Sequence, residues 1–232
     1  MRVIIGCEES QEVCKAFRRL GHEAYSCDVL PCSGGHPEWH IQDDCLKHLD
    51  DGWDLGIFHP PCTYLSKAGA CRLYKKAGIV DRGRLAHGME AKSFFLKLLN
   101  SKIPKIAVEN PTPLKIYKLP IHSQVIQPYM FGHPFSKRTL LWLKGLPLLK
   151  PTNIVKDYVP FLPSNTGGKK RGQMFRVEKE RVRDPKIASK TFTGIAEAMA
   201  TQWGSLISLV INKKEDGLHP TDESVGIRPT IL

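Results

Sequence analysis

The sequence predicts an α/β fold in which a doubly wound, mostly parallel sheet ends in an antiparallel pair of strands. Up to residue 110, apolar segments of strand length alternate with segments whose apolar residues repeat at helical spacing. Strands that alternate with helices run parallel within one sheet, because each helix carries the chain back to the starting edge. Two more apolar segments then follow in close succession, which predicts the antiparallel pair.

The first strand and helix show this pattern most clearly. Residues 2–7 (RVIIGC) form a continuous apolar segment, as in a strand that is buried on both faces. The apolar residues at positions 13, 16, 17 and 20 then lie on one face of a helix within residues 10–21, which Gly21 is suited to end. The remaining predicted strands are residues 22–29, 54–59, 105–110, 123–129 and 138–145, and the remaining predicted helices are residues 85–101 and 192–211.

The composition divides the chain into one α/β domain, an insertion and a tail. Residues 1–145 and 187–211 are predicted to form the domain, and the polar residues 212–232 a mobile tail. Residues 146–186 are rich in Pro, Gly, Lys and Arg and are predicted to form a short basic insertion. A net charge of +11 and a pI near 9.4 favour a polyanionic partner. A solvated loop would have a similar composition, but we expect basic residues of the insertion to face nucleic acid. These residues are Lys169, Lys170, Arg171, Arg176 and Arg181.

The absence of targeting and membrane patterns predicts a cytoplasmic protein without a membrane partner. No apolar run approaches the roughly 20 residues of a membrane span, and no signal-peptide cleavage pattern follows the first strand. The seven cysteines are odd in number and irregularly spaced, which favours buried reduced thiols over a disulfide framework. A zinc site is an alternative for Cys32, His36, His40 and Cys45, but their spacing matches no standard module, so no metal is expected.

Four groups of chemically useful residues follow the predicted strands. GCEES follows the first strand, Asp28 closes the second, PPC follows the strand at 54–59, and ENP closes the strand at 105–110. In an open α/β sheet, ligands bind in the crevice outside the carboxyl ends of the strands. We therefore expect these four groups to meet at one site.

The first turn favours a positively charged cofactor over a dinucleotide. Asp28 lies about 20 residues beyond the first turn, where an acid accepts hydrogen bonds from ribose hydroxyls. The turn lacks the Gly-x-Gly that lets the backbone approach a pyrophosphate, and Glu8 and Glu9 would repel phosphates. The same two carboxylates are compatible with the ammonium and sulfonium groups of S-adenosylmethionine.

Two of these groups resemble the catalytic motifs of the pyrimidine C5-methyltransferases, the family of the DNA cytosine-5 methyltransferases. Pro61-Cys62 ends one predicted strand, Glu109-Asn110 ends the next, and 46 residues lie between Cys62 and Glu109. The resemblance implies a Rossmann-like class I S-adenosylmethionine-dependent methyltransferase, in the form of a compact, phage-like member. It covers most of residues 2–145 and again residues 188–205.

The resemblance also implies site residues elsewhere in the chain. FGHPFSKRTLLWL is similar to a degenerate Gly-x-Pro-Gln-x-Arg-x-Arg segment, which adds Lys137 and Arg138 to the catalytic residues. SKTFTGIAEAMA resembles the helix that closes the cofactor pocket, and Ser66 matches a serine of the cysteine loop and is assigned to nucleic-acid contact. The expected cofactor-binding residues are Gly6, Cys7, Glu8, Glu9, Ser10, Asp28, Val29, Asp43, Asp44, Pro60 and Thr191.

The chemistry of C5 methylation explains the residue types. A thiolate that attacks C6 of cytosine converts the ring to an enamine that accepts a methyl group at C5, and Cys62 is the expected thiolate. An acid at N3 stabilises the developing charge, and Glu109 is the expected acid, with a pKa raised by a water-poor pocket and with Asn110 holding it in place. Because a stacked base is inaccessible, a duplex DNA substrate would require base flipping.

Departures from the family pattern leave several alternatives open. Cys7, Glu8 and Glu9 replace glycines of the first motif, and Phe135 replaces the glutamine of the later segment. The short insertion predicts short or relaxed sequence specificity, or help from a homodimer or an auxiliary specificity protein. The alternatives to DNA are RNA or a free pyrimidine nucleotide. An inactive nucleic-acid-binding relative is another possibility, whereas a thiol redox protein lacks a resolving cysteine in register with Cys62, although Cys71 is near in sequence.

Overall fold

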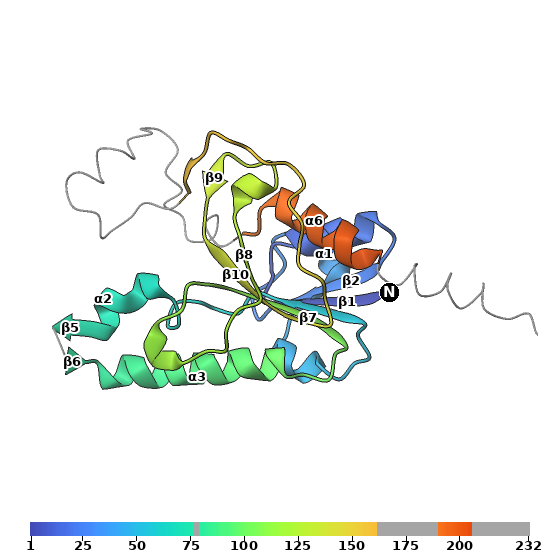
Figure 1. Cartoon of the computed structure of the whole chain (residues 1–232). Coiled ribbons are helices and arrows are strands. Elements are labelled where there is room, and N and C mark those ends of the chain that lie inside the picture. The colour runs from blue at the N-terminus through green and yellow to red at the C-terminus, as the bar shows by residue number, and fades with distance from the viewer. Residues whose placement is uncertain (77–78, 162–189, 206–232) are drawn as a thin grey trace, which may run out of the picture.

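The structure is a computed structural model that describes residues 1–76, 79–161 and 190–205 (Figure 1). Three layers are visible, with a sheet in the middle, one long helix on one face and two helices on the other. Among the helices described, none combines the length and the apolar character that crossing a membrane requires. The described residues belong mostly to the predicted α/β domain, and they include the first part of the predicted insertion, up to residue 161.

The elements follow the predicted alternation of strands and helices. The sheet strands are β1 (Arg2–Gly6), β2 (Glu23–Cys27), β3 (His40–Ile41), β4 (Leu55–Phe58), β7 (Lys105–Pro111), β8 (Gln124–Ile126) and β10 (Thr139–Lys144). The helices are α1 (Glu12–Arg19), α2 (Ala70–Leu73), α3 (Arg82–Leu99) and α6 (Thr193–Gly204). Short 3₁₀ helices cover Pro37–Trp39, Cys45–His48, Lys67–Gly69, Lys115–Tyr117 and Pro128–Met130. Two small ribbons consist of β5 (Tyr74–Lys76) with β6 (Ile79–Val80), and of β9 (Phe135–Ser136) with β11 (Val159–Pro160).

The seven-stranded sheet confirms the predicted fold class. Its order is β3-β2-β1-β4-β7-β10-β8, with the first five strands parallel and β10 antiparallel to both of its neighbours. The first five positions follow the doubly wound order, in which the chain reverses direction between β1 and β4. The reversed strand in the last but one position is the arrangement expected for a class I methyltransferase fold.

Side chains of alternate strand residues build two cores, one on each face of the sheet. Val3 and Ile5 of β1 pack with α1 and α6, whereas Ile4 points to the other core, which α3 covers. This period of two is the signature of a strand that is buried on both sides. Figure 1 shows the same division, with α3 on one side of the sheet and α1 and α6 on the other.

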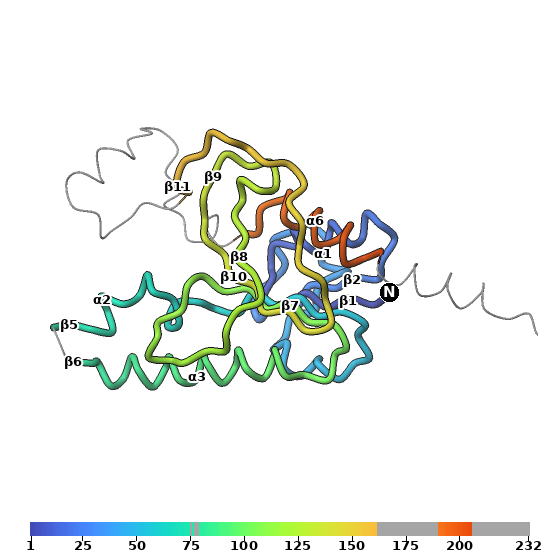
Figure 2. Tube along the Cα trace, viewed as in Figure 1, coloured from blue at the N-terminus to red at the C-terminus, as the bar shows by residue number. Residues whose placement is uncertain are grey.

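The structure adds elements that the sequence pattern did not predict. The edge strand β3 has only two residues, and the segment after β4 makes an excursion through α2, β5 and β6 before α3 begins. β9 and β11 form a two-stranded parallel ribbon, and Figure 2 shows them side by side above the sheet. Residues 162–186 of the predicted insertion, residues 206–211 of the predicted helix and the predicted tail lie outside the described residues.

Candidate active site

The carboxyl ends of β4 and β7 bring His59 and Glu109 together. Phe58 pairs with Val108 in the parallel register, so the next residues, His59 and Glu109, occupy neighbouring positions on the same face. His59 Nδ1 lies 2.8 Å from Glu109 Oε2, and only 12% and 20% of the two side chains are exposed. His59 is not among the site residues that the sequence predicts. The signal was available, because parallel strands in register place the residues that follow Phe58 and Val108 side by side.

The contact between His59 and Glu109 is a buried ion pair. Burial raises the pKa of Glu109, but the hydrogen bond and charge of His59 and the charge of Lys137 outweigh burial and lower it. Burial lowers the pKa of His59, but the hydrogen bond and charge of Glu109, together with the charge of Glu8, raise it. The predicted raised pKa of Glu109 is therefore wrong, because the prediction considered burial without a cationic partner.

Cys62 lies in the same electrostatic environment as Glu109. Its thiol is half-buried, and burial and the charge of Glu109 raise its pKa, whereas the charge of Lys137 lowers it. The charges of Glu109 and Lys137 thus both reach the Cys62 thiol, and the charge of Lys137 also reaches Glu109. A neutral Glu109 would favour the Cys62 thiolate, because the opposing negative charge would be gone.

Backbone hydrogen bonds tie the loop of Cys62 to the loop that follows Glu109. Ser66 N donates to Cys62 O at 2.9 Å and closes a turn directly after the cysteine. Lys67 N donates to Thr112 O and Leu114 N donates to Leu65 O, both at 2.8 Å, so the two loops are cross-linked. Buried Pro60 fixes the backbone φ before the cysteine. These contacts limit the movement of Cys62 relative to Glu109.

A guanidinium group supports the same loop from α3. Arg84 Nη2 donates to Thr63 O at 2.7 Å, and the guanidinium carbon lies 4.9 Å from the centre of the Tyr64 ring. Ser66, predicted to contact nucleic acid, is buried in this loop. Its backbone N–H closes the turn after Cys62, and its contact with nucleic acid stays a prediction.

Asn110 does not hold Glu109 as predicted. Its Nδ2 donates to Pro111 O at 3.0 Å, and its buried Oδ1 has no hydrogen-bond partner among the described residues. β7 places successive side chains on opposite faces of the sheet, so Asn110 points away from Glu109. The structure gives the predicted supporting role to His59.

Lys137 and Arg138 differ in their surroundings. Lys137 Nζ lies 5.9 Å from the ring centre of Phe192 and 6.0 Å from that of Phe161, beside the ion pair that its charge influences. Arg138 is exposed.

The predicted cofactor residue Thr191 is half-buried and directly precedes Phe192, so the segment before α6 approaches the same region.

Both carboxylates of the turn after β1 accept hydrogen bonds from neighbouring segments. Cys7 adopts a left-handed backbone conformation (φ 60°) and donates its N–H to Cys27 O at 2.7 Å, at a position where glycine is the common choice. Glu8 is 5% exposed, and its carboxylate accepts hydrogen bonds from Val13 N and Cys14 N at 2.7 and 3.2 Å. Burial raises the pKa of Glu8 to about 7. Glu9 accepts a hydrogen bond from Ser33 Oγ at 2.7 Å.

The predicted adenosine-side acids lie at the ends of β2 and β3. Asp28 Oδ1 accepts a hydrogen bond from Leu30 N at 2.9 Å, and no partner of Oδ2 is found among the described residues. Asp43 Oδ1 lies 2.7 Å from Lys47 Nζ, and this contact lowers the pKa of Asp43 to about 2. Asp44 caps the following 3₁₀ helix through Leu46 N. Gly6 ends β1, Ser10 is buried and Val29 is exposed.

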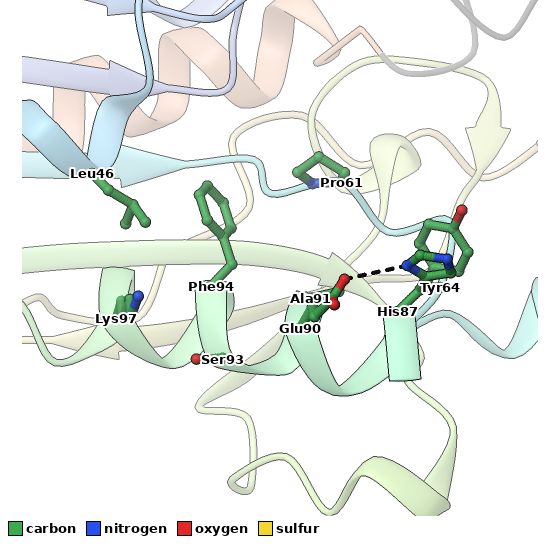
Figure 3. Close-up of a pocket in the computed structure, with 9 residues that line it drawn as sticks. All are labelled: Leu46, Pro61, Tyr64, His87, Glu90, Ala91, Ser93, Phe94 and Lys97. Carbon is green, nitrogen blue, oxygen red and sulfur yellow. Dashed lines mark hydrogen bonds and ion pairs between the residues drawn. The ribbon is translucent and has the colours of Figure 1, made fainter. Parts of the chain in front are cut away.

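An open pocket of about 530 Å³ lies between these strand ends and α3 (Figure 3). Leu46, Pro61 and Phe94 contribute apolar walls, so the pocket is flanked by the segment after Asp44 and by the segment after Pro60. Glu90 and His87 form an ion pair on its rim, with Nδ1 and Oε2 3.2 Å apart. None of the predicted cofactor residues lines this pocket directly. The complete lining is Leu46, Pro61, Tyr64, His87, Glu90, Ala91, Ser93, Phe94 and Lys97.

Two further predictions concern nucleic-acid contact and a metal. The predicted phosphate-binding residues Lys169, Lys170, Arg171, Arg176 and Arg181 lie outside the described residues. Within residues 1–76, 79–161 and 190–205, no three His, Cys, Asp or Glu side chains converge as a metal site would require. The zinc alternative therefore gains no support, since Cys32 and His36 instead contact Gln11.

Comparisons with known proteins give structural neighbours only. No protein-family model and no curated protein sequence matches the chain. A DNA modification methyltransferase encoded within an E. coli prophage is 14% identical, with a TM-score of 0.43, over 67% of this chain and 52% of its own. The Entamoeba histolytica methyltransferase EhMeth is 14% identical, with a TM-score of 0.43, over 72% of this chain and 61% of its own. The S. pombe Dnmt2 methyltransferase is 17% identical, with a TM-score of 0.41, over 64% of this chain, which spans about half (52%) of that neighbour.

Proposed function

We propose that the protein transfers a methyl group from S-adenosylmethionine to C5 of cytosine in DNA, through a covalent bond between Cys62 and C6. One observation carries this proposal. A half-buried thiol and a largely buried carboxyl lie at the carboxyl ends of adjacent parallel strands, and the charge of the carboxyl acts on the thiol. Backbone hydrogen bonds cross-link the segments that follow them. A nucleophile and an acid held in this way suit addition to both sides of one pyrimidine ring.

Each residue of the site has a role in that addition. The thiolate of Cys62 attacks C6, and the carboxyl of Glu109 serves N3, where negative charge develops. The cation of Lys137 lowers the pKa of Cys62 and so favours its thiolate. Lys137 and Arg138 are the candidates for contact with O2 of the base. Loss of the C5 proton and departure of the thiolate then restore the aromatic ring.

The residues at the strand ends fit an adenosine-containing methyl donor. S-adenosylmethionine would supply an electrophilic methyl group. The apolar walls of the pocket beside Pro61 suit an adenine ring, and Asp28 Oδ2 suits a ribose hydroxyl. Glu8 and Glu9 place two acidic side chains near the end of β1, which is compatible with a cationic methionine moiety, although Glu8 already caps α1.

The substrate is proposed to be a base flipped out of duplex DNA. Reaching C6 with a thiolate requires the ring to leave the stack, and phosphates on both sides must then be held. The net charge of +11 suits that task. The short insertion suits short or relaxed sequence specificity, as in a modification enzyme of a phage, or recognition shared with a second subunit or an auxiliary protein.

The decisive experiment combines methyl transfer with a substrate panel. The full chain is incubated with methyl-labelled S-adenosylmethionine and duplex DNA, single-stranded DNA, RNA or nucleotides, and the nucleosides are then analysed. We expect labelled 5-methylcytosine from DNA. Label in RNA or in free nucleotides instead would reassign the substrate, and salt-insensitive substrate binding would argue against any polymer.

Two cysteine variants test the mechanism. Cys62→Ala should abolish transfer and retain cofactor binding, and Cys71→Ala is the matched control, because this thiol is exposed. DNA that contains 5-fluorocytosine should trap an adduct on Cys62, because fluorine cannot leave as a cation; mass spectrometry locates the adduct. Turnover by Cys62→Ala would reject the covalent mechanism. Substrate binding without turnover by the wild-type chain would favour the inactive nucleic-acid-binding alternative.

A further inference from the structure

We infer that His59 is a positioning residue that stores a transferable proton beside Glu109, so that the two residues act together as the acid that serves N3 of the pyrimidine ring. The inference rests on the proposed function, since it concerns a step of the same reaction. It adds a residue that neither the sequence motifs nor the resemblance supplied.

The geometry of the pair carries the inference. His59 Nδ1 donates to Glu109 Oε2 at 2.8 Å, where neighbouring strands end and little solvent reaches either side chain. A charge-assisted hydrogen bond of this kind is short and strong, and burial strengthens it further. Nε2 of the same ring is buried and has no hydrogen-bond partner among the described residues. His59 therefore makes its one described side-chain hydrogen bond to Glu109.

The charges around His59 favour its protonated form. Glu109 of β7 and Glu8 of the turn after β1 both raise the pKa of His59, whereas burial and Lys137, between β9 and β10, lower it. The raising contributions prevail, so the ring carries the additional proton while Glu109 is a carboxylate. A carboxylate by itself has no proton to offer N3. The imidazolium at hydrogen-bond distance supplies one.

The proton balance of the step is complete without another reactant. Before attack, Cys62 is a thiolate, Glu109 a carboxylate and His59 an imidazolium. As the S–C6 bond forms, the C5–C6 π electrons shift through the ring and negative charge develops at N3. The carboxylate of Glu109 takes the proton from His59 Nδ1 and passes it to N3, which leaves a neutral imidazole and restores the carboxylate. When the thiolate departs from the methylated ring, the proton of N3 returns along the same path.

The first test measures the protonation of His59 without any activity assay. The full chain is labelled on histidine nitrogen and titrated by NMR, and the signal missing in His59→Asn identifies His59. We expect its pKa above the ordinary value of 6.5 in the wild type and below 6.5 in Glu109→Gln, because burial remains when the anion is removed. A wild-type pKa at or below 6.5 would overturn the inference, whatever the activity.

The second test compares pH profiles of methyl transfer. In His59→Asn the amide still donates a hydrogen bond to Glu109 but stores no proton, so burial raises the pKa of Glu109 and Glu109 itself becomes the acid. We expect the activity of His59→Asn relative to wild type to fall by at least about tenfold between about pH 6 and about pH 8. His36→Asn is the control, since His36 makes a similar but exposed contact with Glu38.

These outcomes separate the inference from the proposed function. A purely structural role for His59 would lower activity by the same factor at every pH, and that result would reject the proton store while leaving the methyltransferase intact. If the wild-type chain transfers no methyl group to any substrate of the panel, the proposed function fails and the inference fails with it. If His59→Asn does not fold, the histidine signal whose pKa falls in Glu109→Gln identifies His59, and the titrations of wild type and Glu109→Gln still decide the matter.

Discussion

Glu8 and Glu109 are two buried glutamates whose charges both act on His59, yet their proton affinities are shifted in opposite directions. Glu8 follows β1 and caps α1, and burial raises its pKa to about 7. Glu109 lies near the carboxyl end of β7 and contacts His59 directly, and this contact lowers its pKa. Burial opposes the charged form in both cases, so the nature of the hydrogen-bond donor decides the result.

The comparison shows that backbone amides and an imidazolium are not equivalent partners. The charge of His59 and two N–H groups of α1 lower the pKa of Glu8, but the hydrogen-bond donors provide only partial charges, and together these contributions do not outweigh burial. A full positive charge 2.8 Å away does outweigh it for Glu109. The molecule thereby keeps one carboxyl that gains a proton close to neutral pH and another that stays ionised.

The largest expected effect comes from replacing Glu109, the glutamate that stays ionised. Glu109→Gln removes both the proton carrier and the anion that pairs with His59, and a buried acid of this kind typically contributes 10²–10⁴-fold to the rate. We expect kcat for methyl transfer to fall by about 10²–10⁴-fold. The measurement is transfer of labelled methyl groups at saturating substrate and cofactor.

The control for this variant removes a carboxylate from the molecular surface. Glu23→Gln makes the same chemical change at the start of β2, where half of the side chain is exposed. Its kcat should stay within about twofold of wild type, as expected for a surface substitution. A Glu109→Gln enzyme that keeps more than about a tenth of the wild-type rate would remove Glu109 from the list of reacting groups.

The second expected effect concerns Glu8 and is measured as the pH dependence of the free energy of unfolding. A carboxyl whose pKa rises from 4.5 to about 7 on folding binds a proton in the folded state that the unfolded chain has lost. Stability therefore falls as the pH rises through this interval, by about 3 kcal/mol at roughly 1.4 kcal/mol per unit. Glu8→Gln should flatten this part of the profile, and urea unfolding between about pH 4.5 and about pH 7 measures it.

The two members of the ion pair have opposite dependences on pH, so that Glu109 opposes the Glu8 effect and His59 adds to it in the same experiment. The lowered pKa of Glu109 gives stability that is present above its ordinary pKa of 4.5 and is lost as the pH falls through the folded value. The raised pKa of His59 gives stability that is present below 6.5 and is lost as the pH rises through its folded value. If the free energy of unfolding of wild type and of Glu8→Gln changes with pH in the same way, burial of Glu8 does not reduce stability as the pH rises.

The sheet could be predicted from the sequence because its signals are local. Continuous apolar segments mark β1, β4 and β7, and the spacing of apolar residues marks α1; the bounds differ from prediction by only a few residues. The two-residue β3 contains His40, and the ribbon of β5 and β6 is rich in lysine, so neither has a pattern to detect. Both depend on pairing with a neighbouring strand.

The placement of Cys62 and Glu109 at one edge of the sheet was predictable from the sequence, whereas the electrostatics around them were not. Cys62 and Glu109 follow from their positions after apolar segments, because the carboxyl ends of parallel strands meet at one edge. The pKa of Glu109 depends on His59, a contact across 50 positions of the chain that only the strand register reveals. In the same way, Cys7 adopts a left-handed backbone without being glycine, because its N–H is fixed by Cys27 O of the neighbouring strand.

The smallest expected effect uses Cys62 to report the charge of Glu109. Burial and Glu109 raise the pKa of Cys62, so Glu109→Gln should lower it and Lys137→Met should raise it further. A fall of one unit yields about ten times more thiolate, and the lower nucleophilicity of that thiolate reduces the gain to about threefold. Iodoacetamide labelling near neutral pH, with the Cys62 peptide quantified against the exposed Cys71, measures the rate. Glu109→Gln should accelerate labelling and Lys137→Met should slow it. Equal labelling rates in wild type and both variants would mean that solvent screens Cys62 from both charges. In that case Cys62 and Glu109 would not form one site.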